Sequence, residues 1–228
     1  DTEVLGVAHR DGRLHLQTSR GDMAYKHVVN CAGLHADTLA RKMGVDTGLR
    51  IIPFRGEFFS LTPERCDLVN GLIYPVPDPK LPFLGVHFTR RIDGSVEAGP
   101  NAVLAFAREG YKMTSVNVAE TLATLSYRGF WAMGARYWMR GMQEFYRSLS
   151  KKAFVKSLQQ LVPEIEESHL ERGSAGVRAQ EVERNGLMAD DFHITETQNA
   201  IHVRNAPSPG ATASLAIGKD IVAMATKS

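Results

Sequence analysis

The sequence predicts an α+β protein whose first and last parts form one domain around an inserted middle. Strand patterns come first and are followed by one helix, more strands, a helical block, further strands and a last helix. The chain has 228 residues, 43% of them hydrophobic, which is enough for one large core or two smaller ones. The predicted boundaries of the three parts are 1–48, 49–172 and 173–228.

The first part is predicted to open with a three-stranded meander. Asp11-Gly12 is a typical hairpin turn between two alternating apolar and polar runs. Apolar residues with helical spacing then predict a helix over 36–43, ended by Gly44. The predicted strands cover residues 4–9, 13–18 and 23–30.

The middle part combines strands with a helical block. A long strand is predicted over 48–61, interrupted at Pro53 and Gly56. The segment 74–82 is rich in proline and cannot be a regular helix or strand over its whole length. A hairpin is expected about Asp93-Gly94. Its strands cover 83–89 and 95–99, and the three predicted helices cover 117–127, 133–149 and 150–162.

The last part returns to strands and closes with a helix over about 210–226, in which small residues are frequent. Its strands are predicted over 175–182, 192–196 and 200–204.

Composition excludes several classes of function. The formal net charge is +2 and the basic residues are scattered, which does not favour a nucleic-acid partner. The first residues of the given sequence are not expected to be a signal peptide, and no apolar run approaches the ~20 residues of a membrane-spanning helix. The chain starts at Asp1 directly before a strand pattern, which is interpreted either as a start inside a larger domain or as a trimmed or processed terminus.

Metal and redox motifs are also absent from the sequence. The eight histidines lack metal-ligand spacing, and no G-x-G-x-x-G, H-E-x-x-H or G-x-S-x-G motif occurs. Cys31 and Cys66 form no C-x-x-C pair and are expected to be buried small residues of a reducing compartment.

The turn at 205–212 is the clearest functional signal. A short strand enters a Pro/Ser/Gly turn that opens a helix, so backbone N–H groups and the positive helix end point at whatever lies above the turn. An ordinary helix start is the alternative. Small residues, including Ala206, Gly210 and Ala211, favour close approach of a flat ligand.

A second ligand-facing turn is suggested at Val28–Gly33. There a buried strand ends in small residues at a helix entry, which is where ligands bind in open α/β sheets. Tight strand-to-helix turns need small residues in any case, so this signal is weak alone.

Two ionisable residues are candidates for chemistry. His87 shares a strand face with Gly85 and Thr89 and could accept a proton near neutral pH, or be a hydrogen-bonded structural histidine. Arg178 in a small, apolar strand needs a carboxylate, either that of a substrate or an internal one. The candidate internal partners are Glu181, Glu183 and Asp190, and for Arg55 the neighbouring Glu57 is the expected partner.

Aromatic residues gather in the helical block between Tyr127 and Tyr146. Core packing is the default interpretation. A face for a membrane or a protein partner is the alternative, supported by Lys151, Lys152 and Lys156.

Several long motifs resemble the L-2-hydroxyglutarate oxidase/dehydrogenase family, flavoenzymes of the D-amino-acid-oxidase-like superfamily. The resemblance covers almost the whole chain and is weaker over 112–172. The motifs are IIPFRGE at 51–57, LIYPVPD at 72–78, PFLGVHFT at 82–89, DGSVEAGPNAVLAF at 93–106, REGY at 108–111, AGVRAQ at 175–180 and NAPSPG at 205–210.

This resemblance implies FAD as cofactor and oxidation of a 2-hydroxy acid to 2-oxoglutarate. It implies that His87 is the base, that Arg178 binds the substrate carboxylate, and that Tyr74 and Asn101 line the pocket. The cofactor-binding residues that it implies are Cys31, Ala32 and Gly33 along the nucleotide portion, and Ser208, Gly210, Ala211 and Thr212 at the pyrimidine end of the flavin.

The chain departs from the family because the N-terminal phosphate-binding G-x-G-x-x-G loop is absent. The resemblance therefore implies the C-terminal part of the enzyme: an incomplete α/β FAD-binding domain with an inserted mixed-sheet and helical substrate domain. The expected electron acceptor is oxygen or a quinone, and the expected location is cytoplasmic. Peripheral contact with the inner membrane and self-association stay open, as do an amine or amino-acid oxidase and a non-catalytic binding module.

Overall fold

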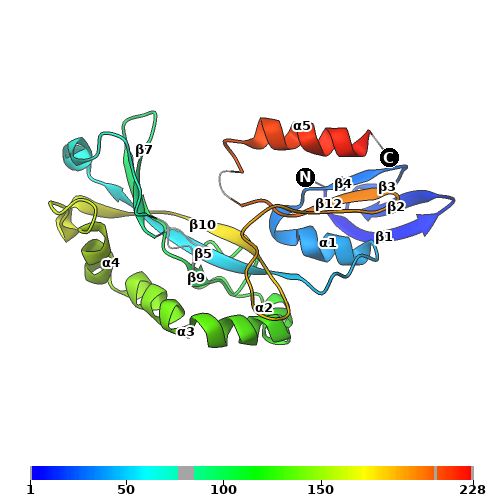
Figure 1. Ribbon diagram of the computed structural model, residues 1–228, viewed down its shortest axis with the longest axis horizontal. Coiled ribbons are helices and arrows are strands. Elements are labelled where there is room, and N and C mark those ends of the chain that lie inside the picture. The colour runs from blue at the N-terminus through cyan, green and yellow to red at the C-terminus, as the bar shows by residue number, and fades with distance from the viewer. Residues whose placement is uncertain (1, 77–84, 208–209, 227–228) are drawn as a thin grey trace. The chain divides into compact units, whose positions relative to one another are not determined.

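A computed structural model describes residues 2–76, 85–207 and 210–226 (Figure 1). The chain forms two compact units. Unit 1 contains residues 1–51 and 179–228, and unit 2 contains residues 52–178. Both helices and sheets contribute to the structure, which confirms the α+β class.

Unit 1 begins with an antiparallel meander in the order β1-β2-β3. Asp11 and Gly12 have φ of 50° and 69° in the turn between β1 and β2, the positive values that a tight two-residue hairpin requires. The predicted hairpin is confirmed. The strands are β1 (Val4–Arg10), β2 (Arg13–Thr18) and β3 (Gly21–Tyr25).

The second sheet of unit 1 joins the two ends of the chain. Its order is β11-β12-β4, and β4 runs parallel to β12. The single strand predicted over 23–30 is wrong, because β3 and β4 belong to different sheets. The Asn199 side chain donates to the carbonyl of Lys26 at the break and so holds the chain between the two strands. The bounds are β4 (Val28–Asn30), β11 (His193–Glu196) and β12 (Ala200–Asn205).

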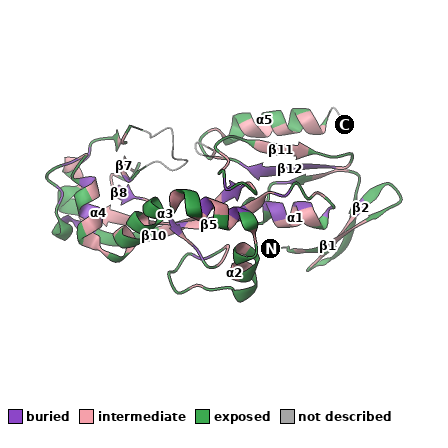
Figure 2. Cartoon of the chain, turned by 60° about the horizontal axis from the view of Figure 1, so that its bottom comes forward, coloured by how far each residue is buried: buried purple, intermediate pink, exposed green. Residues whose placement is uncertain are grey.

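Helices α1 (Ala36–Lys42) and α5 (Ser214–Ala225) lie on opposite faces of this second sheet in both views (Figures 1 and 2). Every residue of β12 is buried, as expected for a strand covered on both faces. A 3-10 turn over Gly33–His35 leads into α1. The last helix starts at Ser214, so the predicted start near Gly210 is wrong; residues 210–213 form a turn, and glycine and threonine are poor helix formers.

Unit 2 is built on a six-stranded sheet in the order β10-β5-β8-β7-β6, with β9 also paired to β5. The predicted interruption of β5 at Pro53 and Gly56 is wrong. The Pro53 carbonyl accepts from Ala105, and a Cβ on Gly56 would approach Pro100 to 2.7 Å, so the glycine permits close packing within a continuous strand. The strands are β5 (Arg50–Leu61), β6 (Leu72–Ile73), β7 (His87–Arg90), β8 (Val96–Gly99), β9 (Val103–Leu104) and β10 (Leu170–Val182).

Three helices follow β9: α2 (Val118–Leu125), α3 (Arg128–Leu149) and α4 (Lys151–Leu158). Phe154 and Leu158 of α4 are fully buried in the core of unit 2, where the Phe154 ring lies 4.8 Å from that of Phe59. Much of α3 is exposed (Figure 2). Within the described residues, no helix combines the length and the apolarity needed to cross a bilayer.

Candidate functional site

The first residue of β7, His87, carries the best-defined chemistry of unit 2. Its ring stacks on that of Tyr74, with centroids 4.3 Å apart and planes inclined by 26°. The Nδ1 atom lies 3.1 Å from the carbonyl oxygen of Gly85. A carbonyl can only accept, so Nδ1 carries the proton and Nε2 presents a lone pair.

The surroundings of His87 keep its ring neutral. Burial lowers its pKa below the ordinary 6.5 as the main effect, the Gly85 hydrogen bond raises it, and the charge of Arg178 lowers it further. At neutral pH the ring is therefore neutral. Of the predicted residues, Tyr74 contacts His87 directly, and Arg178 acts on it through its charge.

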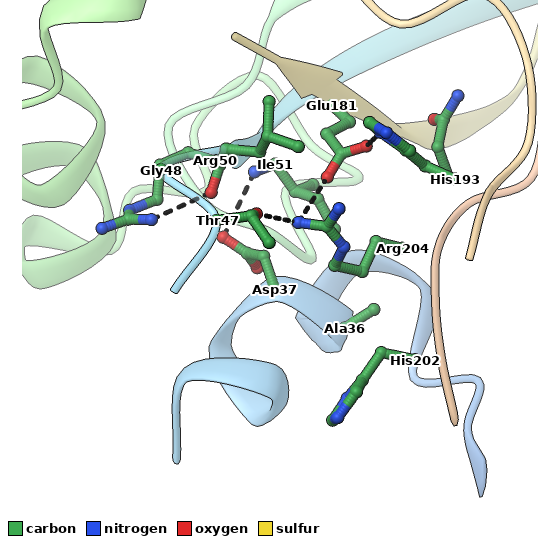
Figure 3. Close-up of polar contacts among 12 residues, drawn as sticks. Ala36, Asp37, Thr47, Gly48, Arg50, Ile51, Glu181, His193, His202 and Arg204 are labelled. Carbon is green, nitrogen blue, oxygen red and sulfur yellow. Dashed lines mark hydrogen bonds and ion pairs between the residues drawn. The ribbon is translucent and has the colours of Figure 1, made fainter. Parts of the chain in front are cut away.

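Arg178 lies in β10 and is an exposed residue. Desolvation lowers the pKa of its guanidinium, which still remains charged at neutral pH. Of the candidate internal partners, Glu181 binds Nδ1 of His193 at 2.5 Å and Nη1 of Arg204 at 3.2 Å (Figure 3). The planar guanidinium of an arginine such as Arg178 is chemically suited to a carboxylate.

Asn101 has a different environment from the other predicted residues. It is 3% exposed, its Oδ1 accepts from the backbone N–H of Glu57 at 2.7 Å, and its Nδ2 donates to Glu57 Oε2 at 2.9 Å. Ser148 of α3 also donates to Glu57 Oε2. The structure therefore connects Asn101 to Glu57 and not to His87 through its described hydrogen bonds.

Glu57 was not singled out by the sequence as the centre of this network. The expected ion pair with Arg55 is confirmed at 2.9 Å. The available signal was the spacing of the two residues, which places both side chains on one face of β5. This network links β5 to α3 within unit 2.

The predicted nucleotide-facing turn lies between β4 and α1. Cys31, Ala32 and Gly33 are all exposed, so the expected burial of Cys31 is wrong. Partial burial nevertheless raises the pKa of the Cys31 thiol, which keeps it protonated at neutral pH. Gly33 has φ of 53°, and apart from its two chain neighbours no described residue has a heavy atom within 4 Å of the position that a Cβ would take there. The turn is therefore open to a ligand on that side.

The second predicted cofactor turn follows β12. Gly210, Ala211 and Thr212 lie in a turn before α5, whereas Ser208 falls outside the described residues. The N-cap residue Ala213 supplies no side-chain acceptor to the start of the helix. The preceding strand end is held by Asn205, whose Nδ2 donates to the carbonyl of Asp191 at 2.8 Å.

Asn30 and His202 are buried polar residues that the sequence did not reveal as partners. Their side chains meet through Nδ2 and Nδ1 at 3.1 Å. The available signal was a polar residue in each apolar strand, Asn30 as the last residue of β4 and His202 as the third of β12. The sequence contains no information that pairs these strands in this register.

Comparisons with known proteins identify relatives over almost the whole chain. L-2-hydroxyglutarate dehydrogenase of Indibacter alkaliphilus is 54% identical over 228 residues, covering 99% of this chain and 57% of the relative. The Escherichia coli K12 enzyme of that name is 43% identical over 97% of this chain and 53% of the relative. The human mitochondrial L-2-hydroxyglutarate dehydrogenase is 45% identical, and the match covers 88% of this chain and 44% of the relative. The chain thus spans about half the length of these relatives.

Solved structures show the same fold at low sequence identity. L-α-glycerophosphate oxidase from Mycoplasma pneumoniae, solved with FAD bound, has a TM-score of 0.63 and 18% identity, covering 97% of this chain and 49% of that one. Glycerol-3-phosphate dehydrogenase from Bacillus halodurans, complexed with FAD, has a TM-score of 0.55 and 15% identity, covering 99% and 39%.

A family model described as FAD dependent oxidoreductase matches residues 1–224. Because this match includes both units and every described site residue, the chain belongs to the family of FAD-dependent oxidoreductases.

Proposed function

We propose that this chain supplies the substrate-binding part and one side of the cofactor site of an enzyme that oxidises L-2-hydroxyglutarate to 2-oxoglutarate with FAD. The observation that carries the proposal is His87, a neutral imidazole that stacks on Tyr74, presents its Nε2 lone pair and is influenced by the charge of Arg178. The printed names of the relatives supply the substrate.

The residues of unit 1 fit a bound dinucleotide. The turn at Cys31–Gly33 is exposed, and it is open where a Cβ would stand on Gly33. The turn at 210–212 is also made of small residues next to a helix start. We assign the first turn to the nucleotide portion of FAD and the second, with Ser208, to the pyrimidine end of the flavin.

We assign a different role to each of the two units. Unit 1 would belong to the FAD-binding domain, and unit 2 would be the substrate domain. FAD, when bound, supplies the acceptor for the hydride that leaves C2 of the substrate.

The residues of unit 2 have complementary roles in this reaction. The Arg178 guanidinium binds a substrate carboxylate through two parallel hydrogen bonds and so orients the molecule. His87 Nε2 takes the proton of the C2 hydroxyl as the C2 hydrogen leaves with two electrons, which balances the conversion of alcohol to ketone. Tyr74 holds the imidazole plane by stacking, and we assign Asn101 to the pocket wall through its bonds to Glu57.

The test uses this chain joined to the part of the Indibacter alkaliphilus relative that it does not match, called the full-length enzyme below. The purified protein should be yellow, and its flavin absorbance should bleach without oxygen on addition of L-2-hydroxyglutarate, with formation of 2-oxoglutarate. D-2-Hydroxyglutarate, glycine, sarcosine and D-amino acids serve as controls. Faster bleaching by an amine would favour an amine or amino-acid oxidase, and a protein that takes up no flavin would favour a non-catalytic binding module.

We also propose that the outward face of α3 binds a membrane surface peripherally. Its large apolar side chains are between 52% and 64% exposed and recur with helical spacing on one side of the helix. This apolar face consists of Trp131, Trp138, Met139, Met142, Phe145, Tyr146 and Leu149.

The charges around the apolar face suit anionic lipid. Arg128 and Arg136 are exposed on α3, and the acidic residue of the helix, Glu144, is paired with Arg147. Aromatic side chains flanked by basic ones are typical of helices that lie in the interface of a bilayer. This location would favour a membrane quinone over oxygen as the electron acceptor.

Vesicle binding tests the membrane contact. The full-length enzyme is expected to sediment with phosphatidylcholine vesicles containing phosphatidylglycerol and less with phosphatidylcholine alone, and salt should weaken the binding. The double variant Trp138→Ser/Phe145→Ser should lose it. Leu5→Ser, which removes an apolar side chain of 54% exposure from β1, should not.

Two results would contradict the membrane contact. One is equal binding by the parent and the double variant. The other is a concentration-dependent dimer that the double variant abolishes without any vesicle binding by the parent, which would assign the apolar face to self-association. Oxygen consumption at the same rate as quinone reduction would contradict the preference for a quinone.

A further inference from the structure

Two adjacent parallel strands carry the two turns that we assign to FAD. β4 ends at Asn30 and leads into Cys31–Gly33, whereas β12 ends at Asn205 and leads into the turn before α5. In the parallel register His202 lies opposite Asn30. Because parallel strands end at the same edge of a sheet, the relative position of the strands sets the spacing of the two turns.

Asn30 uses its whole side-chain amide to hold the first turn. It is 1% exposed, its Oδ1 accepts from the N–H of Ala32 at 3.1 Å, and its Nδ2 donates to the carbonyl of Ala36 at 2.8 Å. These two bonds hold the chain at Ala32 and Ala36, on either side of Gly33. The second Nδ2 proton points to His202 Nδ1 at 3.1 Å.

The state of His202 follows from this contact. An amide N–H can only donate, so Nδ1 of His202 accepts and the ring is neutral with its proton on Nε2. Burial, and secondarily the charge of Arg204, lower the pKa of His202, which agrees with a neutral ring. Figure 3 shows His202 beside Ala36, at the start of α1.

The buried imidazole of His202 is destabilising, so it does more than fill space in the core. His202 is 0% exposed, and its Nε2 has no hydrogen-bond partner among the described residues. A buried donor without an acceptor is destabilising, so an aliphatic side chain would fill the space at lower cost. What the imidazole adds is the acceptor that orients Asn30.

We propose that Asn30 and His202 are a positioning pair that sets the spacing of the two cofactor-facing turns and thereby the affinity for FAD. The inference rests on the proposed FAD site and adds to it two residues that do not touch the reacting atoms. It predicts that the pair acts on cofactor affinity separately from the stability of the fold.

The test compares His202→Leu and His202→Gln in the full-length enzyme. The leucine removes the acceptor, and FAD should bind roughly tenfold more weakly, the effect of one ordinary hydrogen bond. The melting temperature of the FAD-free protein should stay equal or rise, because the unsatisfied Nε2 is removed as well. The glutamine offers a side-chain oxygen to Asn30 and should restore most of the affinity.

Asn30→Ala supplies a second readout where the leucine variant fails to fold. The loss of FAD affinity in Asn30→Ala should be nearly the same with histidine or glutamine at 202, and the double variant Asn30→Ala/His202→Leu should lose less than the sum of the single losses. Three results would overturn the positioning role. They are unchanged FAD affinity in His202→Leu, losses of FAD affinity that add in the double variant, and a loss of FAD affinity fully matched by lower stability of the FAD-free protein. If the parent itself bound no FAD, the proposed cofactor site would fail instead.

Discussion

Replacing His87 with alanine in the full-length enzyme is expected to slow flavin reduction by L-2-hydroxyglutarate about 10²- to 10⁴-fold, the usual contribution of a general base. The substitution removes Nε2, the acceptor for the hydroxyl proton, and leaves a space beside the Tyr74 ring. Added imidazole should restore part of the rate by entering that space. FAD content should remain that of the parent, because the cofactor turns lie in unit 1.

The pH dependence gives an independent check of the base. The neutral form of His87 is the active one, and its pKa is lowered below 6.5, so the rate should fall only as the pH drops below that value. Stopped-flow measurement of flavin reduction without oxygen gives both the rate and its acid limb, which is the fall of the rate at low pH. His9→Gln, which changes an exposed histidine at the end of β1, should behave as the parent. A parental rate in His87→Ala would remove His87 as the base.

The regular parts of the fold were predictable because their patterns are local. The Asp11-Gly12 hairpin and the strands around it follow from alternation and from positive φ at two adjacent residues. The errors arose where a distant contact decides the local structure. β5 continues past Gly56 because Pro100 packs against it, and β3 separates from β4 because Asn199 holds Lys26.

The candidate site shows the same limit. His87 and Arg178 could be singled out as ionisable residues in apolar strands, but their influence on each other depends on a sheet order that no local pattern contains. Asn101 could be expected in the pocket wall, but its binding to Glu57 depends on the packing of residues 99–101 against β5. The pairing of Asn30 with His202 likewise depends on the register between opposite ends of the chain.

Replacing Arg178 with alanine is expected to weaken substrate binding about 10²- to 10³-fold, since two hydrogen bonds to a charged carboxylate are lost. Arg178→Lys keeps the charge but not the planar pair of donors, so it should recover only part of the affinity. Arg172→Ala, an exposed position in the same strand, is the matched control and should leave binding unchanged. The measurement is the substrate concentration that half-saturates flavin reduction.

The same variants separate a carboxylate-binding role from a merely structural one. The charge of Arg178 lowers the pKa of His87, so alanine at 178 should move the acid limb of the rate to higher pH, whereas lysine should leave it near its parental position. A structural defect would lower the substrate affinity of both variants without producing this difference in pH dependence. Substrate affinity depends on the geometry of the donors, so Arg178→Lys should resemble Arg178→Ala in the half-saturating concentration. The pH at which the rate falls depends on the charge at 178, so Arg178→Lys should resemble the parent in the pH dependence. An Arg178→Ala enzyme with parental half-saturation and an unmoved acid limb would contradict both roles.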